Sequence, residues 1–251
     1  MNNYSLLVVP GFLGSKVVID EWARIAHENK VMLVTDFRNL DSAANTMRLF
    51  EQCKYTGAEA YKANVVMTCN WVVGRAAAEE AGEKQPLFVP PSTALAGRMY
   101  ANNIAQVSAG KHFGVLRSVP GCRFDIRAND LSDLGELGLV PMVFEIGQVQ
   151  AFSARTLFNG TNLGLQTSSV VRTFDWLTKS MMDYLNRMLF RNISTNMEMD
   201  IHKEIARFMD KCKRESKTIE KFGQITVKRD PQQRDRVFVN VHITPFFPAK
   251  N

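Results

Sequence analysis

Two consecutive prolines, Pro90 and Pro91, place the firmest constraint on how this chain can fold. They end the short apolar run Leu87–Val89, because proline supplies no backbone N–H and fixes φ. Ser92 or Thr93 follows directly, and both are residue types that cap helices. The sequence therefore predicts a strand, a break, and a helix that begins at the Ser-Thr pair.

Small residues, Ala94, Ala96 and Gly97, occupy the first turns of this predicted helix. They let a helix lie close against a neighbouring element, so we expect a packing contact there. The segment 87–98 contains no nucleophile paired with a base, no cluster of metal ligands and no phosphate-binding loop. It indicates a role in packing.

The first 75 residues alternate apolar runs with segments of helical periodicity. Buried strands are predicted at 4–9, which ends at a Pro10-Gly11 turn, at 31–34 and within 63–73. One helix follows Ser15 as its N-cap, and a second follows Asp41 or Ser42. This order predicts parallel βαβ units with helices on both faces of the sheet. The apolar positions of the helices are Val17, Val18, Trp22, Ile25 and Ala26 in the first, and Met47, Leu49 and Phe50 in the second.

Two long helices are predicted at about 171–191 and 198–217, after two short strands around Gly147. Each carries apolar residues at helical spacing. The expected inner positions are Phe174, Leu177, Met181, Leu185 and Met188 in the first helix, and Ile201, Ile205, Phe208 and Cys212 in the second.

The end of the chain alternates strictly between apolar and polar residues, on either side of a polar turn at 229–235. A period of two predicts a β-hairpin with one apolar face. Because an isolated two-stranded hairpin is marginally stable in water, we expect more strands beside it, from its own chain or from another. The apolar face consists of Ile225, Val227, Val237, Val239, Val241 and Ile243.

Composition and charge narrow the class of protein. With 45% hydrophobic and 22% charged residues, the chain is typical of a globular protein. It has no signal peptide and no apolar run of the ~18 residues that a membrane span needs. Residues 201–251 hold 12 basic and 6 acidic side chains, which accounts for the net charge of +6. Only Phe208 lies among the basic residues from Lys203 to Lys221, so a surface that faces an acidic protein partner or solvent is favoured over one that binds nucleic acid.

Catalytic and metal-binding patterns are missing from the sequence. The turn 10–15 lacks the Gly-Lys-Ser/Thr of a phosphate-binding loop, and no Gly-x-Ser-x-Gly elbow of a hydrolase occurs. The histidines and cysteines are dispersed without ligand spacing, which indicates free thiols in a reducing cytoplasm. We therefore expect no catalytic residue, cofactor or metal. The dispersed residues are His27, His112, His202 and His242, and Cys53, Cys69, Cys122 and Cys212.

Three segments together resemble contractile sheath proteins. Residues 89–97 are similar to the V-P-P-S-x-x-x-A-G pattern of phage tail sheaths and of the large sheath subunit of type VI secretion systems. Residues 152–157 are similar to the phage W-G-A-R-T-L, with Phe-Ser in place of Trp-Gly. Residues 221–247 resemble the closing hairpin of the type VI large subunit, most of all in Bacteroidetes-type systems. The similarity runs in order along the chain and corresponds to the C-terminal half of the family's longer subunits.

The resemblance implies a structural protein and not an enzyme. Its fold would be a mixed α/β sheet flanked by helices, with a C-terminal hairpin that joins a sheet between subunits. The expected parts are an α/β body at 1–103, a second part of the body with the two long helices at 104–220, and the linking hairpin at 221–251. The motif residues implied to be structural are Pro90, Pro91, Ser92, Ala96, Gly97, Arg155 and Thr156.

The resemblance also implies partners. They are a small sheath subunit, further copies in a helical polymer, and an inner tube protein that the cytoplasmic sheath propels by contraction. The unfoldase that recycles such sheaths would recognise an N-terminal helix outside these residues. We expect Arg155 to pair with a carboxylate or with helix C-terminal carbonyls. Two alternatives stay open: a phage-type tail sheath, and an α/β hydrolase or nucleotide-binding enzyme built on the first 75 residues.

Overall fold

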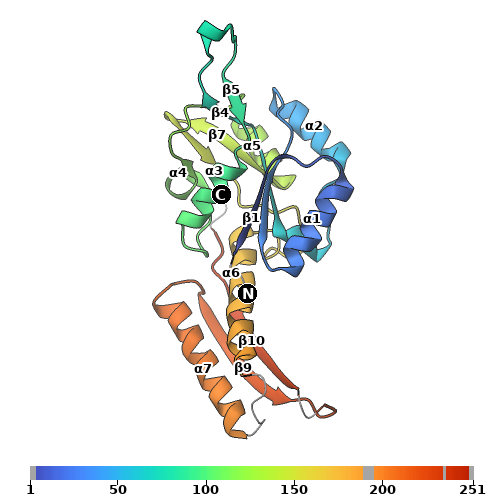
Figure 1. Ribbon diagram of the computed structural model, residues 1–251, viewed down its shortest axis with the longest axis vertical. Coiled ribbons are helices and arrows are strands. Elements are labelled where there is room, and N and C mark those ends of the chain that lie inside the picture. Colours follow the sequence, from blue (N-terminus) through green and yellow to red (C-terminus); the bar gives the residue numbers. More distant parts are fainter. Residues whose placement is uncertain (1–3, 189–194, 234–235, 249–251) are drawn as a thin grey trace. The chain divides into compact units, whose positions relative to one another are not determined.

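The computed structural model describes residues 4–188, 195–233 and 236–248. Its chain forms two compact units, residues 1–172 and 173–251 (Figure 1). These units differ from the expected divisions at 103 and 220. Strands from 139–151 join the same sheet as the first strands, and the terminal hairpin shares a core with the helix before it.

The first unit is built on a six-stranded mixed sheet in the order β1-β2-β3-β7-β8-β6. β1, β2, β3 and β7 run parallel, and β7, β8 and β6 pair antiparallel. A separate hairpin of β4 and β5 leads into the Pro-Pro segment. The strands are β1 (Leu6–Phe12), β2 (Met32–Asp36), β3 (Val65–Cys69), β4 (Val72–Arg75), β5 (Leu87–Val89), β6 (Val115–Leu116), β7 (Leu139–Glu145) and β8 (Gln148–Ala151).

Helices cover both faces of this sheet. Successive residues of a strand point to opposite faces, so neighbouring residues of β2 belong to different cores. Leu33 belongs to a core formed with α1, α2 and α5, whereas Met32 and Val34 belong to a core formed with α3 and the start of α6. The mixed sheet flanked by helices is confirmed. The helices are α1 (Lys16–Glu28), α2 (Ala43–Cys53), η1 (Ala60–Asn64), η2 (Glu79–Ala81), α3 (Ser92–Ala101), α4 (Gly110–Phe113), α5 (Ala128–Glu136) and α6 (Ser168–Asn186).

The second unit consists of α6 from residue 173, α7 (Thr195–Arg214) and an antiparallel hairpin of β9 (Lys221–Arg229) and β10 (Val237–Thr244). The predicted C-terminal hairpin is therefore confirmed. Its core contains Leu177 from α6 and a stripe of α7. No helix in the described ranges combines the length and apolar character that crossing a bilayer requires.

Several local expectations were wrong. β1 continues through Pro10 and Gly11 to Phe12, where a turn was expected. In α1 the buried residues are Ile19, Ala23 and Ala26, since the strands lie on that side of the helix. Three apolar residues at helical spacing in α1, Val17, Val18 and Ile25, are exposed, and so is Phe174, an expected inner residue of α6.

Candidate subunit interface

The apolar face of the β9–β10 hairpin is packed against its own chain. Its side chains pack against a buried cluster from α6 and α7, in which Leu177, Ile201, Ile205, Met209 and Cys212 are almost inaccessible to solvent. The hairpin is therefore anchored by α6 and α7 and does not depend on another chain to cover this face. The packed hairpin residues are Ile225, Val227, Val239, Val241 and Ile243; Val237 lies at the end of the same face and outside the cluster.

The backbone N–H and C=O groups of these hairpin residues face the outer edges of the hairpin. The Asp230 N–H donates to the Arg236 carbonyl at 2.9 Å, so this pair bonds across the hairpin. Hydrogen-bonded and non-bonded pairs alternate in an antiparallel ladder. Val227–Val239 and Ile225–Val241 are therefore non-bonded pairs, and their N–H and C=O groups face outward. Within the described residues no strand pairs with either outer edge.

The Pro-Pro-Ser segment is anchored by a buried carboxylate at the end of β2. Asp36 is inaccessible to solvent and accepts both the backbone N–H of Ser92, at 2.8 Å, and its hydroxyl, at 2.5 Å. The Thr68 hydroxyl, at 2.5 Å, and the Gly11 N–H, at 2.8 Å, complete the set. Burial raises the pKa of Asp36 and outweighs the hydrogen bonds, which lower it. The carboxylate thus joins β1, β2 and β3 to α3.

The residues around the prolines play parts that differ from the expectation. Pro91 occupies the N-cap position of α3, and no side chain caps this helix. Ser92 does not cap the helix because its hydroxyl bonds Asp36. Ala96 is buried, as a packing residue should be. Gly97 is exposed, and a Cβ there would meet no atom within 4 Å, so the expected contact at Gly97 within the chain is wrong.

Arg155 and Thr156 hold the loop that precedes α6. The Arg155 guanidinium donates to the side-chain oxygen of Gln166, where a carboxylate or helix carbonyls were expected. The Thr156 hydroxyl donates to the Leu165 carbonyl at 2.6 Å. Both contacts join residues 155–156 to residues 165–166, so this motif shapes the loop that leads into α6.

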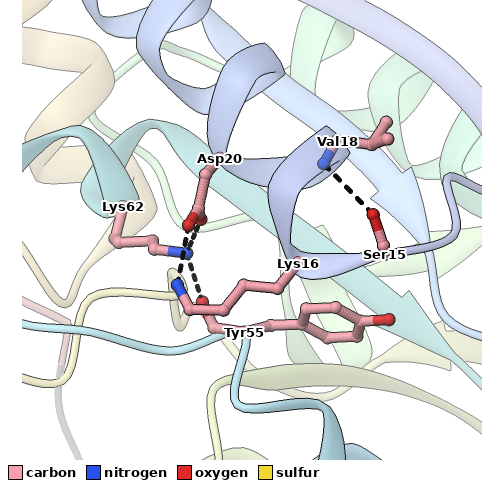
Figure 2. Close-up of polar contacts among 6 residues, drawn as sticks. All are labelled: Ser15, Lys16, Val18, Asp20, Tyr55 and Lys62. Atoms are coloured by element: carbon pink, nitrogen blue, oxygen red, sulfur yellow. Dashed lines mark hydrogen bonds and ion pairs between the residues drawn. The ribbon is translucent and has the colours of Figure 1, made fainter.

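A second buried polar cluster, which the sequence did not reveal, lies between α1 and η1 (Figure 2). Lys62 is fully buried, pairs with Asp20 and donates to the Tyr55 carbonyl at 2.6 Å. Lys16 also pairs with Asp20, at 2.6 Å. Burial lowers the pKa of Lys62. Burial would raise the pKa of Asp20, but the two lysines outweigh it and hold that pKa below its usual value.

The polar groups at the ends of the parallel strands form hydrogen bonds with one another within the chain. The N–H of Gly11, in the segment 10–15 that was considered for phosphate binding, donates to Asp36. The Ser92 hydroxyl donates to the same carboxylate, and no histidine takes part in this cluster. In the part of the chain that the structure describes, no three His, Cys, Asp or Glu side chains gather as metal ligands.

The fold is that of contractile sheath proteins. A chain of the anti-feeding prophage (AFP) baseplate aligns with a TM-score of 0.72 and 16% identity, covering 93% of this chain and 62% of that one. The contracted sheath of the extracellular contractile injection system PVC gives a TM-score of 0.75 and 14% identity, with 99% and 69% covered. The sheath tail protein of Listeria innocua gives 0.69 and 11%, with 97% and 54% covered. The chain thus spans less than two thirds of the AFP chain and of the Listeria protein.

Both parts of the sequence match one family. Residues 1–159 match the central domain of type VI secretion system TssC/VipB, and residues 167–251 match the TssC/VipB-like C-terminal domain. The chain therefore belongs to the TssC/VipB family of type VI secretion systems. The search of curated proteins gave no match.

Proposed function

We propose that this chain is part of the large structural subunit of a type VI contractile sheath, which polymerises around an inner tube and shortens to propel it. The β9–β10 hairpin is the link between subunits. The observation that carries this role is that the apolar side chains of the hairpin pack against α6 and α7, whereas backbone groups of the same residues face outward. Open strand edges pair readily with strands of other chains.

The partners in this proposal are a small sheath subunit, further copies of the large subunit and the inner tube protein. The chain acts as a structural element without enzymatic activity. The match to TssC/VipB domains along both units favours a type VI sheath over a phage-type tail sheath. A cytoplasmic location agrees with the four cysteines, which are all free thiols.

A hydrolase on the first unit is disfavoured by the geometry around Ser92. A serine nucleophile needs a neighbouring base and an accessible hydroxyl. Ser92 is buried and bonds a carboxylate that is itself buried. This arrangement supports a structural role for the segment.

A proline scan of the hairpin tests the proposed link. Val239→Pro removes an outward N–H and leaves the bonds between β9 and β10 in place, which is the setting in which an edge strand tolerates proline. In a full-length large subunit co-expressed with its small subunit, this variant should fold but form no sheaths by electron microscopy. Asn240→Pro is the control, since its N–H bonds β9 and its loss should lower hairpin stability itself. Normal sheaths from both Val239→Pro and Val227→Pro would contradict the proposal.

A further inference from the structure

A groove of about 360 Å³ lies between the N-terminal half of α7 and β9. Its α7 wall consists of Glu198, Met199, His202 and Lys203, and its other wall is residues 224–227 of β9. Four consecutive strand residues can line one groove only along the edge of a strand, because a face exposes alternate residues. The groove therefore follows the open edge of β9.

The backbone of β9 presents free pairing groups to this groove. Ile225 and Val227 are the residues whose N–H and C=O face outward. The α7 backbone runs along β9, so the helix lies over the position that an added strand would occupy beside β9. A strand added at this edge would be covered by α7 on one face.

The α7 wall carries one lysine that has no ion pair among the described residues. Its one acidic residue, Glu198, is already paired with Arg229. Neither His202 nor Lys203 forms an ion pair with any described residue, and both are exposed. The wall thus offers the Lys203 ammonium group to an incoming carboxylate.

The wall also carries an apolar contact. Met199 is 48% exposed beside the groove. Met199 and Lys203 lie four residues apart on α7, which is about 6 Å along the helix. Alternate residues of a strand are about 6.8 Å apart. Successive side chains on the helix-facing side of an added strand would therefore meet Met199 and Lys203 in turn.

We propose that the groove beside β9 receives an extended acidic segment of a partner subunit, with an apolar side chain against Met199 and a carboxylate against Lys203. This inference rests on the proposed function for the pairing of a strand with the hairpin. What it adds is the edge that is used and the chemistry of the segment.

Binding of two fluorescent peptides to the full chain tests the proposal. Both alternate valine and threonine, and they differ at one helix-facing position that is glutamate in one and lysine in the other. The glutamate peptide should bind about tenfold more tightly, which corresponds to ~1.4 kcal/mol. Lys203→Glu should reverse this preference. Lys213→Glu, an equal charge change on α7 outside the groove, should leave it unchanged. Val227→Pro should abolish binding of both peptides.

The possible failures are distinguishable. Equal binding of both peptides, without response to Lys203→Glu, would overturn the acidic preference and leave strand pairing intact. Absence of binding, or binding that survives Val227→Pro, would overturn the use of the β9 edge and count against the proposed function.

Discussion

The Asp36 carboxylate holds Ser92 by two hydrogen bonds, one to its backbone N–H and one to its hydroxyl, although 56 residues separate them. Each carboxylate oxygen also accepts one backbone N–H: Oδ1 from Ser92 and Oδ2 from Gly11. In the ionised form both oxygens therefore act as acceptors at the same time.

Asp36→Asn should destabilise the first unit despite its nearly identical shape. Whichever way the amide is turned, its NH2 group faces a backbone N–H, so one buried donor loses its acceptor. The expected loss is ~1–3 kcal/mol of unfolding free energy, measured by urea denaturation. Asp133→Asn, at an exposed position of α5, is the control and should change stability little. Equal stability of the two variants would show that the carboxylate is dispensable.

The stability difference between wild type and Asp36→Asn should depend on pH. Burial raises the pKa of Asp36 above its ordinary value of 3.8, so above that pH the folded chain holds more protons at this site than the unfolded chain. Stability from this group is then present at low pH and falls as pH rises through the folded pKa. The gap between wild type and variant should be larger at pH 4 than at pH 7. A stability difference between wild type and variant that grows with pH would show that the pKa of Asp36 is lowered in the folded chain.

Removing Asp20 from the cluster around the buried Lys62 should lower the free energy of unfolding more than removing Lys62 itself. Asp20→Ala leaves the Lys62 ammonium group buried without a counter-ion, and the expected loss is ~3 kcal/mol. Lys62→Met keeps the apolar bulk and leaves Asp20 paired with Lys16, so its loss should be less than half as large. Thermal unfolding of the two variants decides the order. A larger loss of stability in Lys62→Met than in Asp20→Ala would mean that the packing of the Lys62 side chain contributes more to stability than the pairing of its charge.

Two neighbouring positions on α3 should respond in opposite directions. Gly97→Ala should raise stability by ~0.5–1 kcal/mol, because the site is open and alanine favours the helix. Ala96→Leu should lower it by ~1–3 kcal/mol through overpacking. Melting curves of both variants check this contrast. Destabilisation by Gly97→Ala would mean that the position touches another element after all.

Local signals predicted the elements well. Ser15 and Ser42 accept the first-turn N–H groups of α1 and α2, as their positions before helical segments indicated. The alternation in 225–243 predicted the hairpin and its apolar face. These features depend on neighbours within a few residues, so the sequence contains all the information that they need.

Features that depend on distant residues could not be predicted. Nothing near Asp36 indicates that Gly11, Thr68 and Ser92 converge on it, because the fold alone brings them together. No residue near Lys62 in the sequence indicates that it is buried, because its burial follows from the position of η1 against α1. The buried face of α1 was misjudged because Val17 and Ile25 fit helical spacing as well as Ile19 and Ala23 do.

The inward side chains of the hairpin have a consequence for how partners are distinguished. A strand that pairs with β9 or β10 meets peptide groups, which are the same for every sequence, and these supply affinity without selectivity. Substitutions at Val227 or Val239 that keep the α7 contact would leave a partner's binding surface almost unchanged. In the proposed assembly, discrimination between cognate and foreign subunits must then come from other side chains, those of α7 or of the exposed face of the hairpin such as Phe238, so the hairpin core can diversify among homologous systems without altering which subunits assemble together.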